Sequence, residues 1–227
     1  MDNMVNELSS EKVKGYGMSA GASVVGIASS KDFDTAPEGL KPGDALKGCL
    51  SVIVLAAHFP REALTNTSVE YTAHRTLMIE KINGIAENVE KRIKSDGYKA
   101  RAVHGFGGKW VNGEQRGLIS LKHAAELAGI GTIGRNHLLT SPEYGNLLWL
   151  SAVLTTADLT PDKKAQFSFC ENCNICVEIC PTKALDDPAS FGKKGCASVF
   201  FKMVDGKWEV QCYLCRKMCP HRFGTLG

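Results

Sequence analysis

The chain has 227 residues, of which 44% are hydrophobic and 22% are charged, as expected for a globular protein with one substantial core and a small additional module. The formal net charge of +3 gives little support for a nucleic-acid partner, and no stretch approaches the roughly 20 apolar residues of a membrane span. Residues 1–16 include Asp2, Glu7 and Glu11 and hold no apolar run of signal-peptide length. We therefore expect a cytoplasmic protein without a membrane span.

The first part of the chain alternates strand-like and helix-like segments. Short apolar runs rich in β-branched residues predict buried strands at residues 23–28 and 51–57, with a loop over the proline- and glycine-containing segment 34–48. Apolar residues within 72–95 then recur every three or four positions, which predicts one face of a long amphipathic helix. These residues are Met78, Ile82, Ile85, Val89 and Ile93, and Gly97 follows as a stop signal.

Further elements are predicted downstream of that helix. We expect a third strand at residues 99–104, a helix at 118–128 and a last strand at 146–155. Strands interleaved with helices indicate an α/β or α+β layered domain, in which the long helix covers a sheet.

The composition changes near Thr160, beyond which the chain is punctuated by cysteines and has little hydrophobic periodicity. We therefore divide the chain into a domain of residues 1–160 and a smaller domain of residues 161–227. Within the second domain, the pair Asp205-Gly206 lies between two apolar segments and predicts a hairpin with a type I′ turn.

A glycine motif precedes the last strand of the first domain. The segment Gly129-Ile-Gly131-Thr-Ile-Gly134 matches the G-x-G-x-x-G pattern of dinucleotide-binding proteins, where the pattern follows a strand and opens a helix. Here it follows the helix-like segment 122–128, and the expected acidic residue about 20 positions further on is missing. The glycines instead predict close passage of the backbone past a bulky ligand. A tight helix-to-loop turn without a ligand is the alternative.

Eight of the nine cysteines lie in the last 58 residues. The run Cys170-x2-Cys173-x2-Cys176-x3-Cys180-Pro181 has the bacterial ferredoxin spacing, in which three cysteines bind one [4Fe–4S] cluster and the fourth binds a second cluster. A second run, from Cys212 to Pro220, is the partner half of that motif without its first cysteine. We assign one cluster to Cys170, Cys173, Cys176 and Cys219. We assign the other cluster to Cys180, Cys196, Cys212 and Cys215.

Two other uses of these cysteines fit less well. A disulfide framework needs an oxidising compartment, and usually a chain too short to build its own core. Structural zinc fits isolated Cys-x2-Cys pairs, whereas segment 170–181 supplies four cysteines in one run, more than one tetrahedral site draws from such a segment. The ninth cysteine, Cys49, lies within the apolar segment 49–57, and we expect it to be a buried small hydrophobic residue.

Segment 128–145 reads Ala-Gly-Ile-Gly-Thr-Ile-Gly-Arg-Asn-His-Leu-Leu-Thr-Ser-Pro-Glu-Tyr-Gly. It resembles the A-G-L-G-x-I-G-[KR]-N-x-L-L-I-x-P-x-Y-G stretch of epoxyqueuosine reductases and cobalamin-dependent reductive dehalogenases. Residues 51–59 resemble an early strand of that family, and the sixteen residues from Cys180 to Cys196 fit its cysteine layout. The resemblance extends from Gly15 to Pro220.

The resemblance implies a nitroreductase-like domain that binds a cobamide (cobalamin) in its base-off form, followed by a ferredoxin-like module whose two [4Fe–4S] clusters pass single electrons to cobalt. It also implies an electron donor of the ferredoxin or flavodoxin type and a small-molecule substrate. The residues implied to line or face the corrin are Gly131, Gly134, Arg135, Asn136, His137, Thr140, Tyr144, Ser198, Cys212 and Tyr213. His137 is not expected to ligate cobalt, because the family holds its cobamide without a protein imidazole.

Three departures from the family pattern bear on the substrate. Epoxyqueuosine reductases carry an aspartate, their proposed proton donor, where this chain has Gln115, which cannot act as a general acid. Glu114 beside it could do so if burial raised its pKa, although a solvated loop position fits it equally well. The stretch from Cys196 to Cys212 is shorter than in tRNA-acting members, and their helical-repeat extension does not follow Pro220. We therefore do not expect a tRNA substrate, and no tyrosine proton donor for dehalogenation can be placed.

Three functions are compatible with these observations. The first is a cobamide-dependent reductase in which two [4Fe–4S] clusters deliver electrons to base-off cobalamin, which reduces a small substrate. The second is a non-catalytic two-cluster electron-transfer protein that reduces a partner such as a corrinoid protein. A third keeps the fold but places a flavin in the nitroreductase-like pocket. The intact segment 129–145 favours the first function, and the missing acid at Gln115 favours the second.

Overall fold

The computed structural model describes residues 8–225 apart from 35, 37–38, 108, 112–113 and 188–190, and the side chains of 109–111 and 114–115 also lie outside the description. Residue contacts divide the chain into two compact units, which we call the sheet unit and the cysteine unit. The sheet unit comprises Met1–Ala57, Ile79–Ile130 and Trp149–Ala165. The cysteine unit comprises His58–Met78, Gly131–Leu148 and Gln166–Gly227.

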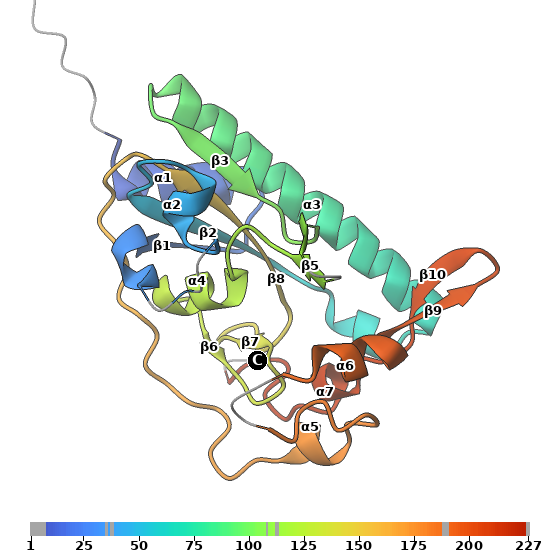
Figure 1. Cartoon of the computed structure of the whole chain (residues 1–227). Coiled ribbons are helices and arrows are strands. Elements are labelled where there is room, and N and C mark those ends of the chain that lie inside the picture. The colour runs from blue at the N-terminus through green and yellow to red at the C-terminus, as the bar shows by residue number, and fades with distance from the viewer. Residues whose placement is uncertain are drawn as a thin grey trace, which may run out of the picture. The chain divides into compact units, whose positions relative to one another are not determined.

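The sheet unit is built on a four-stranded sheet in the order β1-β2-β8-β3 (Figure 1). Its strands are β1 (Val24–Ser29), β2 (Ser51–His58), β8 (Leu148–Thr155) and β3 (Ala100–Val103). Strand β1 runs antiparallel to β2 with Val24 opposite Ala56, and β3 runs antiparallel to β8 with Val103 opposite Ala152. The four predicted strands are therefore confirmed, with small shifts at their ends.

The core of the sheet unit lies on both faces of β2, where residues 52–57 are all 0% exposed. Val25 and Gly26 are consecutive in β1 and so point to opposite faces. Helix α1 (Ser10–Ser19) packs on the Val25 face, where a Cβ added to Gly17 would lie 2.6 Å from that valine. On the other face, a Cβ added to Gly26 would lie 2.4 Å from the carbonyl oxygen of Ala128, which follows helix α4 (Leu121–Leu127). Helices thus cover the sheet on two sides, as the uninterrupted apolar strand predicts.

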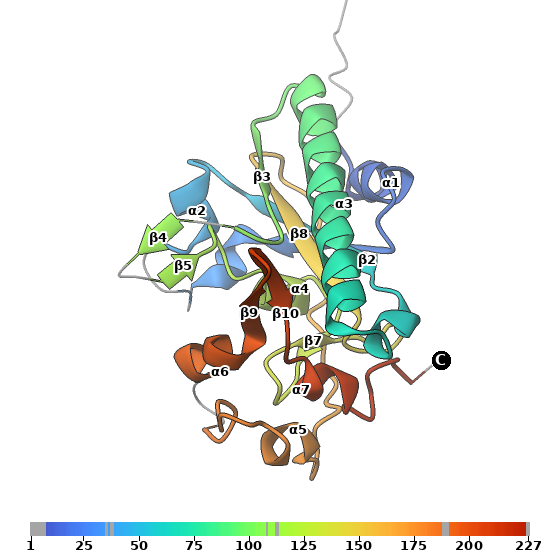
Figure 2. The ribbon, with the colours of Figure 1, turned by 90° about the vertical axis from the view of Figure 1, so that its right-hand side faces the viewer.

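The predicted long helix is α3, Ser68–Ser95. Its five periodic apolar residues are all buried, none more than 7% exposed. Thr67 and Glu70 form a capping box at its start, because the Thr67 N–H donates to the Glu70 carboxylate at 2.9 Å and the Glu70 N–H donates to the Thr67 hydroxyl at 3.3 Å. In the sheet unit, Ser151 of β8 donates to the carbonyl oxygen of Ile82 at 3.0 Å, which ties α3 to the sheet (Figure 2).

The sequence patterns miss α1 and the short α2 (Pro42–Ala45), which lies inside the predicted loop. The start of α1 carries a local signal, since the Ser9 hydroxyl accepts from the Lys12 N–H at 3.2 Å as an N-cap. The other short elements before the cysteines are 3-10 helices Ser30–Phe33 and Arg61–Leu64 and strands β4 (Lys109–Val111), β5 (Glu114–Arg116), β6 (Thr132–Ile133) and β7 (Leu139–Thr140).

The cysteine unit is built from short elements. They are α5 (Ile175–Glu178), α6 (Lys193–Phe200), β9 (Phe201–Val204), β10 (Lys207–Val210) and α7 (Leu214–Lys217). The predicted hairpin is confirmed: β9 pairs antiparallel with β10, and Asp205 and Gly206 both have positive φ, as a type I′ turn requires. The Val210 N–H donates to the Thr72 hydroxyl of α3 at 2.9 Å, which anchors the base of the hairpin (Figures 1 and 2).

The mixed α/β class predicted from the sequence is confirmed, whereas the boundary at residue 160 stays a prediction. The contact-based units are not contiguous, since the cysteine unit also takes in His58–Met78 and Gly131–Leu148. Cys49 is 7% exposed and its thiol donates to the carbonyl oxygen of Ser51 at 3.4 Å, so the prediction of a buried residue is confirmed. Among the described residues, no helix is both long and apolar enough to cross a membrane.

Candidate metal centre

Four cysteines from two distant segments line one pocket in the cysteine unit. Cys170, Cys173 and Cys176 come from the loop and first turn of α5, and Cys219 follows α7. The other lining residues are Asn136, Thr140, Phe169, Ile175, Pro220 and His221. Burial raises the pKa of the Cys176 thiol, and the neighbouring thiols of Cys170, Cys219 and Cys173 raise it further. The structure thus brings together the first predicted quartet.

The second predicted quartet also gathers. Burial raises the pKa of the Cys196 thiol, and the nearby thiols of Cys212 and Cys180 add to the effect. Burial likewise raises the pKa of Cys215 to about 11, and the thiols of Cys196 and Cys212 contribute in the same direction. A bound metal group would favour the thiolate forms of Cys196 and Cys215, because metal binding requires thiolates and its positive charge offsets their mutual repulsion.

Cys180 differs from the other members of its quartet. Burial would raise its pKa, but hydrogen bonds from the backbone and hydroxyl of Thr182 and from the backbone of Ala184 and Leu185 outweigh it, so the pKa of Cys180 is lowered. The Thr182 Oγ1 lies 3.8 Å from the Cys180 sulfur. The surroundings of Cys180 therefore favour the thiolate, in contrast to those of Cys196 and Cys215.

The two quartets are neighbours, since the Cys176 thiol of the first raises the pKa of Cys215 in the second. Within the part of the chain that the structure describes, no three His, Cys, Asp or Glu side chains are gathered closely enough to hold a single metal ion. A [4Fe–4S] cluster does not require such close grouping, because each of its four cysteines binds a different iron.

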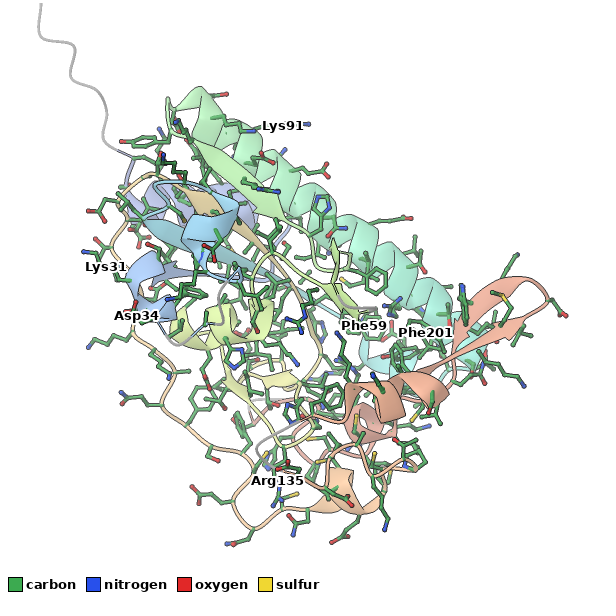
Figure 3. The ribbon with its side chains drawn as sticks, in the orientation of Figure 1. Lys31, Asp34, Phe59, Lys91, Arg135 and Phe201 are labelled. Atoms are coloured by element: carbon green, nitrogen blue, oxygen red, sulfur yellow. The ribbon has the colours of Figure 1, made fainter. Side chains whose placement is uncertain are left out.

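The glycine motif lies directly against the first quartet. A Cβ added to Gly134 would lie 3.4 Å from the Cys170 sulfur, and one added to Gly131 would lie 2.5 Å from the carbonyl oxygen of Thr140. The Arg135 N–H donates to the Cys170 sulfur at 3.4 Å, and Figure 3 shows Arg135 next to the sulfur-bearing side chains. The motif follows α4, as the sequence indicates, and Gly131 is needed for the close approach to the carbonyl oxygen of Thr140.

The predicted corrin-lining residues have definite places in the cysteine unit. Asn136 and Thr140 are buried and line the cysteine pocket, and the Asn136 amide donates to the carbonyl oxygen of Cys215 at 3.1 Å. The Arg135 guanidinium contacts the Asn174 side chain. His137 has a φ of +55° and its ring stacks on Phe191 with 5.1 Å between ring centroids. Contact of these residues with a corrin stays a prediction.

The remaining predicted residues make contacts of other kinds. Tyr144 packs on His58 with 5.1 Å between ring centroids, and burial raises its pKa. Tyr213 stacks on Tyr71 at 3.9 Å with nearly parallel rings and donates to the carbonyl oxygen of Asn66 at 3.0 Å. Ser198 is exposed and donates to the carbonyl oxygen of Gly195 at 2.7 Å.

The candidate proton donors Glu114 and Gln115 fall where the structure describes only the backbone. Both residues are in β5, where Gln115 pairs with Trp110 and Glu114 pairs with Val111 of β4. Their side chains lie outside the described residues, so a role in proton transfer stays a prediction.

Asn146 is a residue that the sequence analysis missed. It is 0% exposed, and its amide donates to the carbonyl oxygen of Arg216 at 3.2 Å. Burial raises the pKa of Cys219, and a hydrogen bond from the Asn146 side chain works against that rise. The amide oxygen Oδ1 is buried and has no hydrogen-bond partner among the described residues, which costs about 1–3 kcal/mol for a neutral group. Its only sequence signal is its position directly after the glycine segment.

Similarity to known proteins supports an iron–sulfur assignment. Residues 166–186 match the family model of a 4Fe-4S binding domain. The chain is 35% identical to an epoxyqueuosine reductase of Synechococcus sp. (strain RCC307) over 106 residues, which cover 42% of this chain and 32% of the relative. It is 25% identical to an epoxyqueuosine reductase of Lactococcus garvieae (strain Lg2) over 224 residues, which cover 88% of this chain and 59% of the relative.

Solved structures share the fold. A crystal structure of epoxyqueuosine reductase with a tRNA-Tyr epoxyqueuosine-modified tRNA stem loop superposes with a TM-score of 0.66 at 22% identity, covering 95% of this chain and 65% of that one. A reductive dehalogenase, whose structure suggests a mechanism for B12-dependent dehalogenation, superposes with a TM-score of 0.60 at 21% identity, covering 77% of this chain and 25% of that one.

These similarities define the chain as an iron–sulfur protein with a 4Fe-4S binding domain and a mixed α/β fold shared with epoxyqueuosine reductases and reductive dehalogenases. The chain is similar in sequence to epoxyqueuosine reductases, and the relationship predicted from segment 128–145 and the cysteine spacing is confirmed. The chain spans about a third to three fifths of the length of these curated relatives.

Proposed function

We propose that this protein is an iron–sulfur, cobamide-dependent reductase in which two [4Fe–4S] clusters supply single electrons. The observation that carries the proposal is the gathering of the cysteines into two neighbouring quartets, one of which lines a single pocket. Four thiolates are the ligand set of one [4Fe–4S] cluster. The first cluster would bind to Cys170, Cys173, Cys176 and Cys219. The second cluster would bind to Cys180, Cys196, Cys212 and Cys215.

The pocket suits a cluster chemically. Apolar groups from Phe169, Ile175 and Pro220 surround the first quartet and would limit the access of water. The Arg135 N–H already points at one sulfur. Burial and N–H donors to sulfur are the means by which proteins tune cluster potentials.

A base-off cobamide is the proposed second cofactor. The proposal draws on segment 128–145 and on the fold shared with a dehalogenase described as B12-dependent. A bound cobamide supplies a redox-active cobalt, and the protein's part is to hold and shield it. The residues proposed to do so are Gly131, Gly134, Arg135, Asn136, His137, Thr140, Tyr144, Ser198 and Tyr213. The proposed electron donor is a ferredoxin- or flavodoxin-type protein, in the cytoplasm.

We propose a small molecule as the substrate. One structural neighbour is an epoxyqueuosine reductase with a tRNA stem loop, so tRNA is the alternative substrate to consider. This chain has Gln115 where those enzymes carry their proposed acid, and its net charge of +3 offers no enlarged basic surface for a nucleic acid. Glu114 is the proposed replacement proton donor. If the missing acid instead means no catalysis, the second candidate is a two-cluster protein that reduces a corrinoid partner.

The clusters are tested first, by anaerobic reconstitution with iron and sulfide. We expect about eight irons for each chain, and about four in Cys176→Ala and in Cys196→Ala, because each variant disables one cluster. Cys49→Ala, which removes the buried ninth thiol, is the matched control and should keep all the iron. Full iron retention in both quartet variants would contradict the ligand assignment.

The cobamide is tested next, by adding hydroxocobalamin to the reconstituted protein, reducing its Co(III) to Co(II) with a one-electron reductant such as Ti(III) citrate, and desalting the mixture anaerobically. A retained base-off Co(II) EPR signal is expected. Loss of all cobalt on desalting, with both clusters intact, would leave the electron-transfer function. Reductase assays with Glu114→Gln and Gln115→Asp then examine the proton donor, since the first should lower activity and the second should restore an acid at the family's position.

A further inference from the structure

The last part of the cysteine unit combines cysteines with positive charge. Residues 210–227 contain no aspartate or glutamate, and they contain three cations: Arg216, Lys217 and Arg222. The cysteines of the same segment are proposed ligands of both clusters: Cys212, Cys215 and Cys219. The peptide that would hold one side of each cluster is therefore basic throughout.

Two guanidinium groups lie over one aromatic ring of this segment. The guanidinium carbon of Arg222 is 4.6 Å from the ring centroid of Phe223, and that of Arg61 is 4.9 Å from the same centroid. The electron-rich face of the ring offsets part of the repulsion between the two cations. The Arg222 side chain also donates to the carbonyl oxygen of Cys219 at 3.1 Å. Two positive charges are thereby held close to a proposed cluster ligand.

Carboxylates of the described chain do not neutralise these two charges. Arg61 is exposed at the start of a 3-10 helix. Glu62 follows Arg61 in the sequence, and the backbone of Glu143 packs against Gly224. Among the described residues, however, neither Arg61 nor Arg222 forms an ion pair with a side-chain carboxylate. Their charge can therefore act on an acidic partner.

Exposed apolar side chains belong to the same segment. Leu214 begins α7 and Met218 follows its last residue, and the two side chains are 41% and 48% exposed. Leu214 directly precedes Cys215, and Met218 directly precedes Cys219, so each adjoins a proposed ligand of a different cluster. Methionine and arginine are both enriched at protein–protein interfaces. Apolar and basic side chains thus occur together beside the proposed clusters.

We propose that Arg61, Leu214, Met218 and Arg222 form the docking surface for the electron donor, a one-electron carrier protein with acidic groups around its redox centre. The inference rests on the proposed function, because it requires the clusters. The reduced carrier gives one electron to the cluster that Cys219 binds. The carrier is oxidised by one electron, the cluster is reduced by one, and no bond forms or breaks.

The size and charge of the surface favour this partner over two others. Four side chains make a small contact, as in transient electron-transfer complexes, which bury less than about 1,200 Å². A symmetric contact with a second copy of the chain would bring the same cations together, and like charges repel. A nucleic acid would bind through several phosphate contacts and would leave Leu214 and Met218 unused.

The test is anaerobic stopped-flow mixing of the reconstituted full chain with a fully reduced flavodoxin chosen for its acidic surface. At low salt, Arg61→Glu should lower the second-order rate constant of cluster reduction about tenfold, because it reverses a steering charge. The difference should shrink at 1 M salt, where charges are screened within about 3 Å. Arg61→Lys keeps the charge and should keep most of the rate.

Lys91→Glu is the matched control. Lys91 is exposed in the sheet unit, so this variant makes the same change in net charge without altering the docking surface, and its rate should stay close to that of wild type. Reduced methyl viologen, a small reductant that needs no docking surface, should reduce the clusters of Arg61→Glu as fast as those of wild type. Slow reduction by methyl viologen would show a damaged cluster and overturn the proposal.

Three other results would also overturn the docking surface. They are an unchanged flavodoxin rate in Arg61→Glu, equal slowing in Lys91→Glu, and no electron transfer from flavodoxin to wild type at any salt. Fluorescence anisotropy with a labelled RNA stem loop tests the nucleic acid. RNA binding that Arg61→Glu abolishes, with the flavodoxin rate unchanged, would assign the surface to RNA instead.

Failure of the proposed function has a separate signature. If the wild-type chain takes up no iron and sulfide, the clusters themselves are absent, and this appears in the metal analysis before any kinetic measurement. If the wild-type chain binds both clusters and methyl viologen reduces them, while flavodoxin reduces Arg61→Glu and wild type at the same rate, only the docking surface fails.

Discussion

The sheet unit and residues 166–227, which we call the cysteine tail, differ in what holds their segments in place. In the sheet unit, the whole of residues 52–57 is buried and residues 79–95 of α3 supply a second apolar surface. Among the described residues of 166–227, the buried apolar side chains are Cys176, Ala184, Leu185 and Val210, and helices α5 and α7 have four residues each. Helices that short are not stable alone.

The difference indicates that the two regions are held in their folded conformations by different interactions. Burial of apolar surface is enough to organise the sheet unit, because its strands and helices are long and their apolar faces are continuous. In the cysteine tail, metal binding would contribute folding energy directly, as in other small metal-dependent modules.

Removal of the iron should have the largest effect, and it should be confined to one unit. We expect chelation under anaerobic conditions to remove most of the hydrogen-exchange protection of amides in α5, α6 and α7, while β2 and β8 keep theirs. Hydrogen exchange, measured by mass spectrometry on the holo- and apo-protein, reports the protection of these helices and strands separately. Equal loss of protection in β2 would show that the sheet unit also depends on the metal.

Truncating a buried side chain in the core of the sheet unit should instead destabilise the sheet unit. Ile53 is 0% exposed in β2, so Ile53→Ala should lower the free energy of unfolding of the sheet unit by about 2–5 kcal/mol, with or without iron. Urea denaturation followed by circular dichroism measures it. Lys91→Ala, on the exposed face of α3, is the matched control and should change little (Figure 3).

Two glycines of the cysteine unit with similar backbone conformation should respond differently. Gly206→Ala, at the hairpin tip with φ +76° and open space around it, should cost about 1 kcal/mol of strain. Gly145→Ala adds a clash with the backbone of His221 and Arg222 and should also reduce iron retention. Iron content and thermal midpoint are measured for both variants. Equal iron retention in the two would contradict the close packing around Cys219.

The smallest effect concerns a charge pair of the sheet unit. Burial would raise the pKa of Asp96, but hydrogen bonds from Lys12 and Tyr16 outweigh it and leave the pKa below its ordinary value of 3.8. A lowered folded-state pKa stabilises the protein above the unfolded pKa, and this contribution disappears as the pH falls through the folded pKa.

Asp96→Asn should therefore lower the thermal midpoint at pH 7 by about 2 °C or less, since partly exposed ion pairs contribute little. The difference from wild type should shrink below about pH 4 as the carboxylate protonates. A gap that persists at low pH would show that the effect does not come from the ionised carboxylate.

Local patterns were sufficient for the long elements, whereas the cluster ligands stay a prediction. The spacing of Met78, Ile82 and Ile85 along the chain predicts α3 because a helix repeats every 3.6 residues, and each of these residues is buried. The Asp205-Gly206 pair predicts the hairpin because both residues tolerate positive φ. The cysteine spacing predicts the two quartets because the ferredoxin motif places the ligands of one cluster in two separate runs.

Contacts between distant residues required the tertiary structure. Asn146 lies 70 positions before Arg216, and nothing in its local sequence marks it as the donor to that carbonyl oxygen. Gly134 matches a nucleotide-binding pattern, yet its neighbour is the Cys170 thiol. Helix α1 has no strong apolar stripe, and its place follows from packing Gly17 against Val25. Periodicity along the chain records which faces are buried, whereas the partner that buries each face is decided only when the segments pack together.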